Sequence, residues 1–283
     1  MTTGLHLPLV LCNVSVADIP LFEVIPAAAR AGFDAISVYG GALRRSIERE
    51  GISPAELAEL VLENGLYVTD VEAVGDWLSP FPPDQPRWLD PGFDEAGFLE
   101  LATVFGARTL VAAHFGPAAP VDEAARQFGR LCDRAAEVGL AVALEYPAMA
   151  TIADAGTAWA IVQAADRPNG GLVHDVWHHD RSSAGDAELA QVPASAFLSV
   201  QLADAAAEAQ GPPIDDVRFR RLLGAGDLEP AEVLRGLVER GVRCPVGIEV
   251  LTAFDRRPPV VRIQELYDSL RTAAVAAGLD PVR

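Results

Sequence analysis

The sequence is short of basic residues: 22 of them stand against 40 aspartates and glutamates, which gives a formal net charge of −18. Phosphate backbones and anionic membrane surfaces bind proteins through clusters of Lys and Arg. We therefore expect no nucleic acid and no membrane as a partner, and we interpret the excess of acidic residues as a feature that promotes solubility.

Cysteine is also scarce, and long apolar runs are missing. Cys12, Cys132 and Cys244 lie far apart and form no CxxC pair, which predicts buried free thiols in a reducing, cytoplasmic compartment. The first residues show no signal-peptide pattern, and no apolar run reaches the roughly 18 residues of a membrane span. No GxGxxG follows the first apolar run and no Walker A sequence occurs, so nucleotide-binding folds lose their usual support.

Short apolar runs alternate along the chain with longer helical patterns, in a composition that is 50% hydrophobic and ample for a core. The predicted strands are Leu7–Asn13, Asp34–Tyr39, Tyr67–Ala73, Thr109–Phe115, Ala141–Pro147, Gly171–Asp175, Phe197–Asp204 and Pro245–Leu251. The predicted helices are Asp18–Ala31, Ser53–Asn64, Phe93–Phe105, Val121–Val138, Ile152–Ala165, Gly185–Val192, Glu229–Glu239 and Arg262–Ala277.

Eight such units favour a closed (β/α)8 barrel over an open sheet, because short helical crossovers force neighbouring strands to pair in parallel. We find no linker and no low-complexity segment, so the sequence predicts one TIM-barrel domain over residues 1–283. The C-terminal strand ends of such a barrel face one pocket, where active sites are built.

Polar residues end these strands: Asn13, Tyr39, Glu72, His114, Glu145, Asp175 with His178, Gln201 with Asp204, and Glu249. Four of them, Glu145, Asp175, Gln201 and Glu249, follow apolar runs and carry oxygen donors. Three converging carboxylates would repel one another, and a divalent cation is the natural remedy. Oxygen ligands suit Mg²⁺ or Mn²⁺, with Zn²⁺ or Co²⁺ as alternatives. Taken singly, each carboxylate could instead be a helix cap or part of a salt bridge.

The motifs LEYP (144–147), HDVWHH (174–179), VQLAD (200–204), RRLLGAGDL (220–228) and GIEV (247–250) resemble the xylose isomerase-like barrels. This superfamily includes sugar phosphate isomerases and epimerases, ketose 3-epimerases, inosose dehydratases and endonuclease IV-type proteins. The resemblance implies that Glu145, Asp175, Gln201 and Glu249 bind one divalent metal. It also implies that His178 contacts the substrate, together with Arg220 or its neighbour Arg221.

The sequence departs from two branches of that superfamily. Ketose epimerases usually carry His at the position of Gln201, and the additional His and Lys ligands of the DNA-repair members are not evident. Within the cluster of Gly171–Asp180, His174 and His179 are interpreted as structural residues. Asp204 is expected to order Gln201 or Arg220.

The preferred hypothesis is a divalent-metal-dependent isomerase or epimerase that acts on a small sugar, keto-sugar or cyclitol through an enediolate. Glu145 and Glu249 would pass the proton as general base and acid. Glu72 and His114 are candidate contacts to the substrate. The alternative is a lyase on the same site, either a dehydratase or an enzyme that cleaves glycosidic or C–C bonds. A metal-dependent hydrolase or endonuclease and a non-catalytic sugar-binding barrel are weaker hypotheses.

The Pro- and Trp-rich connection Asp76–Pro91 carries Trp77, Phe81 and Trp88. It is expected to form an apolar lid over the pocket or, equally, a packed surface loop. Aromatic residues fixed by prolines are also common at interfaces, so a homodimer or homotetramer is left open.

Overall fold

Eight parallel strands close into a barrel in the order of the sequence, with β1 paired to both β2 and β8. This computed structural model describes residues 5–80, 92–182, 186–252 and 255–280. The strands are β1 (Leu9–Leu11), β2 (Ala35–Tyr39), β3 (Tyr67–Val74), β4 (Thr109–Ala112), β5 (Ala141–Leu144), β6 (Gly170–Asp175), β7 (Phe197–Leu202) and β8 (Val246–Ile248). The predicted (β/α)8 barrel is confirmed.

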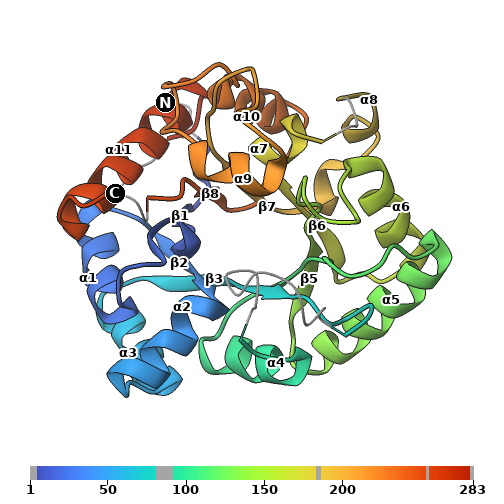
Figure 1. The fold of residues 1–283 in the computed structure, drawn as a ribbon, viewed down its shortest axis with the longest axis horizontal. Coiled ribbons are helices and arrows are strands. Elements are labelled where there is room, and N and C mark those ends of the chain that lie inside the picture. The colour runs from blue at the N-terminus through green and yellow to red at the C-terminus, as the bar shows by residue number, and fades with distance from the viewer. Residues whose placement is uncertain (1–4, 81–91, 183–185, 253–254, 281–283) are drawn as a thin grey trace.

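Helices surround the barrel on its outside (Figure 1). They are α1 (Leu21–Ala31), α2 (Gly40–Arg45), α3 (Pro54–Glu63), α4 (Glu95–Val104), α5 (Val121–Glu137), α6 (Ala155–Ala165), α7 (Val176–Asp180), α8 (Asp186–Leu189), α9 (Pro213–Asp216), α10 (Pro230–Glu239) and α11 (Pro259–Ala276). Short 3-10 turns occupy Asn13–Val16, Ala194–Ala196 and Val217–Phe219, and a π-helical turn occupies Ser46–Glu50. No helix in the described ranges is long and apolar enough to span a membrane.

Local sequence signals explain where two of the helices begin and end. Ser53 and Glu56 form a reciprocal capping box at the start of α3, because each accepts a hydrogen bond from the backbone N–H of the other. Gly32 ends α1 at a φ of 114°, where a Cβ atom would lie 2.7 Å from the ring of Tyr267. Glycine is therefore required at that position by both the backbone and the packing.

The core has two layers. The larger layer lies between the barrel and the helices and buries whole aromatic side chains, among them Phe33, Phe98 and Phe128. A small apolar group of Val111, Ala143 and Val173 forms a separate cluster. Charged residues occupy buried positions on the same strands, as the following section describes, so the polar side chains of the barrel are concentrated where the site lies.

The sequence placed several boundaries wrongly and missed three short helices. We expected helices to begin at Asp18 and Ile152, but α1 begins after Pro20 and α6 begins after Asp154, whose carboxylate accepts from the N–H of Thr157 at 2.8 Å. Predicted starts were too early because apolar spacing continues past the true caps. The helices α2, α7 and α9 were not predicted because they have six residues or fewer, too short for a periodic pattern. Gly185 lies outside the described residues.

Candidate metal centre

The four proposed oxygen ligands all come to the C-terminal mouth of the barrel. Glu145 directly follows β5, Asp175 ends β6, Gln201 lies in β7 and Glu249 directly follows β8. Strand register aligns Gln201 with Asp175 on one side and with Gly247 on the other. Because parallel strands end on the same edge, residues that are 26 to 48 positions apart in sequence become neighbours. Their role as ligands stays a prediction.

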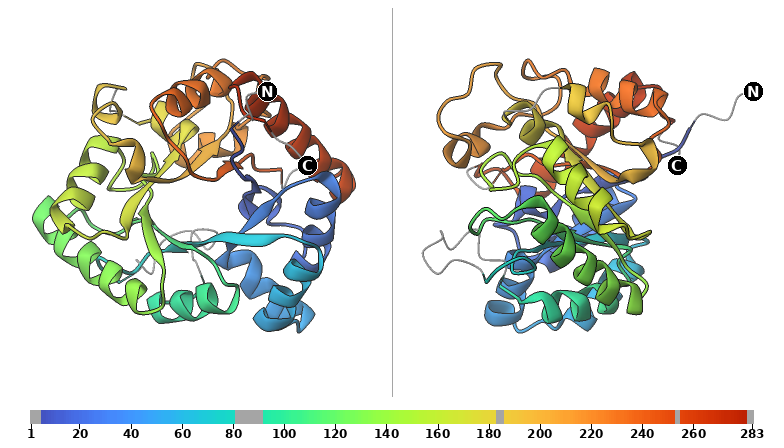
Figure 2. Two further views of the ribbon diagram at one scale, coloured as in Figure 1. Left: turned by 180° about the vertical axis from the view of Figure 1, so that it is seen from behind. Right: turned by 90° about the vertical axis from the view of Figure 1, so that its right-hand side faces the viewer.

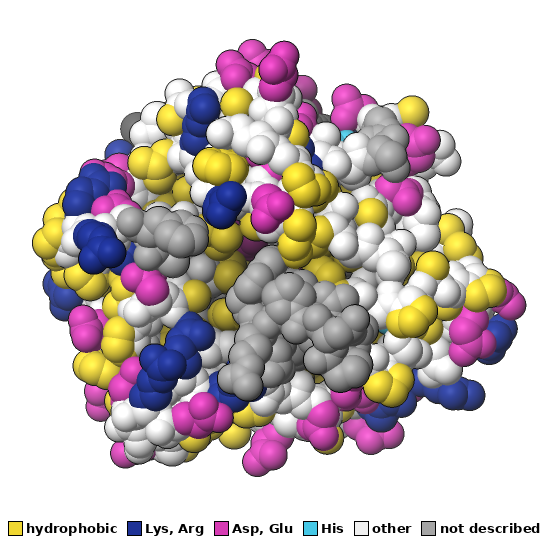
Figure 3. Space-filling model, viewed as in Figure 1, with side chains coloured by type: hydrophobic (Ala, Val, Ile, Leu, Met, Phe, Trp, Pro, Cys, Tyr) yellow, Lys and Arg dark blue, Asp and Glu magenta, His cyan; other side chains and the backbone are white. Residues whose placement is uncertain are grey.

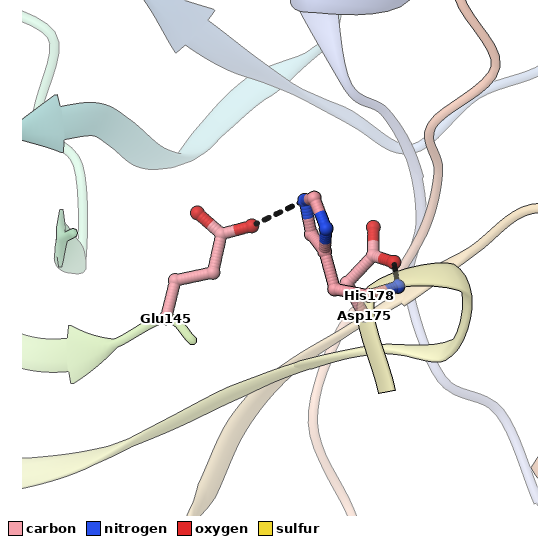
Figure 4. A group of neighbouring side chains, drawn as sticks. All are labelled: Glu145, Asp175 and His178. Carbon is pink, nitrogen blue, oxygen red and sulfur yellow. Dashed lines mark hydrogen bonds and ion pairs between the residues drawn. The ribbon is translucent and has the colours of Figure 1, made fainter. Parts of the chain in front are cut away.

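Asp175 is also the N-cap of α7, which explains the spacing Asp-x-x-His. One carboxylate oxygen of Asp175 accepts from the backbone N–H of His178 at 2.7 Å (Figure 4). The cap fixes the first turn of α7 and turns the His178 ring toward Glu145, with 3.6 Å between Nε2 and Oε1. One oxygen of Asp175 therefore acts as a helix cap, which was the alternative interpretation of a carboxylate at a strand end. The other oxygen accepts from Arg220 within the site.

Glu145, Asp175 and His178 each offer a ligand atom, and these three atoms lie within 4.8 Å of one another. All three side chains are buried or half-buried at the barrel mouth. A group of two carboxylates and one imidazole suits Zn²⁺, Mn²⁺ or Fe²⁺ as well as the oxygen set suits Mg²⁺. The sequence placed His178 beside the substrate, and the structure makes it a candidate ligand as well.

Arg220 joins the remaining carboxylate to this group. Its Nη1 donates to Asp175 Oδ2 and to Glu249 Oε1, both at 2.9 Å, and also to the backbone carbonyl of Glu249 at 3.0 Å. The guanidinium carbon lies 4.6 Å from the centre of the Trp177 ring, and the side chain is fully buried. A planar cation held by an aromatic face and two carboxylates is strongly oriented. Trp177 is a contributor that the sequence did not reveal.

Electrostatic repulsion is only partly relieved in this cluster. Burial raises the pKa of the Glu145 carboxyl well above its usual range, and the charges of Glu249 and Asp175 raise it further. Burial also raises the pKa of Glu249 to about 7, although Arg220 opposes this shift. Burial would by itself raise the pKa of Asp175, but Arg220 and His178 together bring it below its usual value. One arginine thus serves three buried carboxyls in the described part of the chain.

His178 is held as a neutral imidazole, because burial lowers its pKa to about 3. The backbone N–H of Ala148 donates to its Nδ1 at 3.2 Å, while Nη2 of Arg220 donates to its Nε2 at 3.0 Å. A neutral imidazole accepts at one nitrogen and donates at the other, so these two contacts compete. A ligand that draws the Arg220 guanidinium away from Nε2 would leave this nitrogen to face Glu145.

A buried oxygen without a hydrogen-bond partner is a second observation that fits a divalent cation at this site. Gln201 is buried and its Oε1 has no hydrogen-bond partner, whereas its Nε2 donates to Glu72 at 3.4 Å. Glu72 in turn accepts from the Ser37 hydroxyl at 2.6 Å, which fixes its orientation. A buried carbonyl oxygen without a donor is costly, and a cation satisfies it. Glu72 is therefore placed to orient the amide of Gln201, a role that the sequence did not suggest.

The structure separates the other predicted residues from this group. Arg221 is exposed, and its side chain donates to the carbonyl of Ala225 at 3.2 Å, so Arg220 alone of the pair enters the site. His114 is buried, but its Nε2 bonds the carbonyl of Pro117 at 3.0 Å and its ring packs against Trp77. Roles for Arg221 and His114 in binding the substrate stay predictions that these contacts do not support.

Asp204 does not order Gln201 or Arg220 directly, contrary to expectation. Its carboxylate accepts from four backbone N–H groups, those of Ala205, Gly224, Gly226 and Leu228. It therefore shapes the loop that follows Arg220 and acts on the arginine through the backbone.

The predicted apolar lid over the pocket loses one of its three aromatic residues. Trp77 is buried and donates to the carbonyl of Ala113 at 3.0 Å, which makes it a core residue. Phe81 and Trp88 lie outside the described residues.

His174 and His179 lie beside the group. Nδ1 of His174 pairs with the hydroxyl of Tyr146 at 2.7 Å, and Nε2 of His179 lies 3.2 Å from Asp186. Burial lowers the pKa of His174 to about 3, so the ring stays neutral. These contacts agree with the interpretation of both histidines as structural residues.

The fold and this site together define a class, the (β/α)8 barrels that carry an acidic, metal-type centre at their C-terminal mouth. Comparison with known proteins names the family: the chain belongs to the xylose isomerase-like TIM barrels, whose family model matches residues 25–273. Members of this superfamily include epimerases and dehydratases.

One relative and two solved structures illustrate the similarity. The chain is 28% identical over 255 residues to 3-dehydroshikimate dehydratase of Pseudomonas aeruginosa, which covers 87% of this chain and 39% of that protein. The chain thus spans about two fifths of the length of that relative. An IOLI protein with a bound zinc atom superimposes with a TM-score of 0.79 at 18% identity, over 94% of this chain and 97% of the other. D-psicose 3-epimerase from Clostridium cellulolyticum H10 gives 0.70 at 13% identity, over 95% and 99%. The two structural matches show the fold alone.

Proposed function

We propose that this protein is a divalent-metal-dependent lyase that dehydrates a small cyclic hydroxyketone, with 3-dehydroshikimate as the first substrate to test. The observation that carries this choice is the match to 3-dehydroshikimate dehydratase, which extends over 87% of the chain. Because of this match we now prefer the lyase, which was the alternative on sequence alone, to the isomerase. In Figure 3 the acidic side chains are interspersed with arginines and apolar residues, and the net charge of −18 favours a small substrate over nucleic acid.

Dehydration needs a base for the proton next to the ketone and an acid for the departing hydroxyl group. The base removes the proton, the electron pair forms the new double bond, and the hydroxyl leaves as water with a proton from the acid. A divalent cation at this centre would supply polarisation of the ketone oxygen. The remaining steps fall to Glu145, Glu249 and His178, which line the same mouth.

The neighbours of the two glutamates divide these roles. Arg220 donates to Glu249, so Glu249 favours its charged form and is the better base. No such donor bonds Glu145 among the described residues, and its pKa is raised by burial and by neighbouring acids, so it holds a proton more readily. His178, neutral and 3.6 Å from Glu145, is placed to pass that proton to a leaving hydroxyl. Environments that separate two carboxyls in this way are typical of acid–base pairs.

The chain contains no lysine, which bears on the type of dehydration. Enzymes that activate a ketone covalently do so through a lysine amine, as a Schiff base. That route is closed within these 283 residues. Activation by a cation at the carboxylate cluster is the route that the residues support.

Epimerisation is the second candidate, favoured by one observation. Glu145 and Glu249 follow β5 and β8, which lie apart in the barrel, so the two carboxyls can address a substrate from different sides. Removal of a proton on one face and its return on the other would invert a carbon centre. The same residues would then act without loss of water.

One assay separates these reactions. Purified protein, loaded with Mn²⁺ or Mg²⁺, is incubated with 3-dehydroshikimate and with a panel of ketoses in deuterated water. A lyase forms the aromatic product of dehydration, which is followed by its ultraviolet absorbance, and Glu249→Gln abolishes the signal while the exposed Glu59→Gln leaves it unchanged. Deuterium incorporation into a ketose without any aromatic product would support the epimerase and refute the dehydratase. No reaction with any of these compounds would refute both.

A further inference from the structure

A cavity of about 770 Å³ opens at the other end of the barrel, away from the carboxylates. It is lined by residues at or next to the N-terminal ends of five strands, among them Tyr67, Thr109, Phe197 and Pro245. Figure 2, left, looks on to this end of the molecule. The volume suits a small organic molecule, which typically occupies a pocket of about 300–1,000 Å³.

Three arginines line this cavity: Arg108, Arg240 and Arg243. None of them donates to a carboxylate among the contacts of the described residues. Arg240 and Arg243 donate to backbone carbonyls, and Arg108 contacts the face of Tyr67. Eight arginines elsewhere pair with Asp or Glu, namely Arg126, Arg134, Arg167, Arg181, Arg220, Arg235, Arg257 and Arg262, so the charges of the three cavity arginines are not offset in this way.

Two of these guanidinium groups are oriented by aromatic rings of the cavity wall. Arg108 lies 5.3 Å from the centre of the Tyr67 ring, and Arg240 lies 5.9 Å from the centre of the Phe197 ring. The hydrogen bonds of Arg240 to the carbonyls of Leu189 and Val192 leave from Nη2 alone. Stacked guanidinium groups lose less freedom when they bind an anion, and their planar donors match a carboxylate.

The floor of the cavity holds one acidic side chain, Asp70, which accepts from the hydroxyl of Thr69 at 2.6 Å. Three arginines against one aspartate leave the lining positive in a protein whose net charge is −18. Apolar surface accompanies this charge, since Tyr67, Phe197 and Leu198 form part of the wall. Positive charge next to flat apolar surface favours an anion that carries an apolar body.

We infer that the N-terminal mouth of the barrel is a second binding site, for a small carboxylate with a flat apolar body such as an aromatic or cyclic acid. Arg108, which precedes β4, and Arg243, which precedes β8, are the candidate partners of the carboxylate, and the ring packs against the wall near Tyr67 or near Phe197. The lining of this cavity shares no residue with the metal centre, although the charge of Asp70 raises the pKa of Glu145 and Glu249.

Benzoate is a suitable probe, and benzamide is its neutral counterpart. Titration calorimetry at fixed ionic strength should show saturable binding of benzoate with a dissociation constant of about 1 mM or tighter. Benzamide should bind at least about tenfold more weakly, because a charged partner strengthens each hydrogen bond from arginine. The double variant Arg108→Gln/Arg243→Gln should weaken benzoate at least about tenfold. Arg240 is left unchanged because it holds three backbone carbonyls.

The matched control is Arg130→Gln, which replaces an exposed arginine of α5 outside the cavity. It should bind benzoate as the parent does, and circular dichroism should show that both variants remain folded. Equal affinity of the double variant and the control would overturn the inference, as would the absence of saturable binding in the parent. Neither result bears on whether the protein dehydrates 3-dehydroshikimate.

Discussion

The two ends of the barrel carry opposite charge patterns. The C-terminal mouth gathers Glu145, Asp175 and Glu249 around a single arginine, whereas the N-terminal mouth gathers three arginines around a single aspartate, Asp70. The C-terminal mouth therefore suits a cationic ligand, and the N-terminal mouth suits an anionic one. The contrast shows that one scaffold can present two unrelated sites, because both ends of a closed barrel collect residues from many strands.

The ends also differ in how deeply their charges are buried. Asp175 and Arg220 are almost fully buried, while Arg108, Arg240 and Arg243 are exposed to solvent. Buried charges interact strongly and leave a large penalty when one partner is removed, whereas exposed charges are screened. Changes at the C-terminal mouth should consequently have larger effects than changes at the N-terminal mouth.

Removal of either glutamate should have the largest effect. Glu145→Gln and Glu249→Gln each take away a proton carrier and a candidate metal ligand, so we expect turnover to fall by about 10³-fold or more. Bound metal, measured by elemental analysis, should fall in the same variants. Benzoate binding at the other mouth should stay unchanged. A glutamine variant with turnover within tenfold of the parent would remove that glutamate from the mechanism.

Substitution of His178 tests whether it carries a proton or binds the metal. We expect His178→Asn to lower turnover by about 10²-fold. We expect the bound metal to be retained, because the four oxygen donors remain. Loss of the metal together with activity would instead assign His178 to the ligand set with Glu145 and Asp175, in place of Gln201 or Glu249.

Asp204 links the site to the loop that follows Arg220. Asp204→Asn leaves some of its four backbone donors without an acceptor, and we expect it to lower the free energy of unfolding by about 2–4 kcal/mol. Because the backbone of Arg221 pairs with that of Asp204, Arg220 should lose its position and kcat/KM should fall by about tenfold. The exposed Asp227→Asn keeps an amide oxygen that can accept from the one N–H bonded there, that of Ala207, and should have little effect on either quantity.

Asp70 offers the smallest and most specific test. Burial raises its pKa to about 6, above the value in an unfolded chain, so the folded state keeps a proton that the unfolded state releases as pH rises from about 4 to 6. The ionised side chain thus destabilises the fold above that range. Asp70→Asn should stabilise the protein at pH 8 by up to about 3 kcal/mol and change little at pH 4.

The same variant sharpens the contrast between the two ends of the barrel. Since Asp70 is the acid in the lining of the N-terminal cavity, its neutralisation should also strengthen benzoate binding. Denaturation at both pH values and one calorimetric titration measure the two effects. A variant that is less stable than the parent at pH 8 would contradict the account of Asp70.

Much of this architecture could be predicted from the sequence. Repeated strands and helices specify the barrel, and the period of each strand places Glu145, Asp175, Gln201 and Glu249 at its C-terminal ends. Signals of this kind can be recognised in the sequence because each depends only on a short run of neighbouring residues. The choice between Arg220 and Arg221 could not be made, since adjacent residues in an extended segment point in opposite directions and the loop decides which one faces the barrel.

The remaining features depend on contacts between distant segments. The cap formed by Asp175 on α7 and the stacking of Arg220 on Trp177 arise only after β6 and the loop near residue 220 are brought together. Arg108 lies between α4 and β4, whereas Arg240 and Arg243 lie between α10 and β8, and no motif connects the two segments. Trp77 reads as a residue of an exposed loop because it stands among prolines, yet it packs in the core against His114 and Phe128.

The central claim, a cation-dependent dehydratase at the C-terminal mouth, is tested most directly by one measurement: conversion of 3-dehydroshikimate by metal-stripped protein before and after Mn²⁺ is added back. The account predicts no aromatic dehydration product from the stripped protein and its appearance when Mn²⁺ is restored. Equal product formation in excess chelator, or no product with any divalent cation, would contradict it.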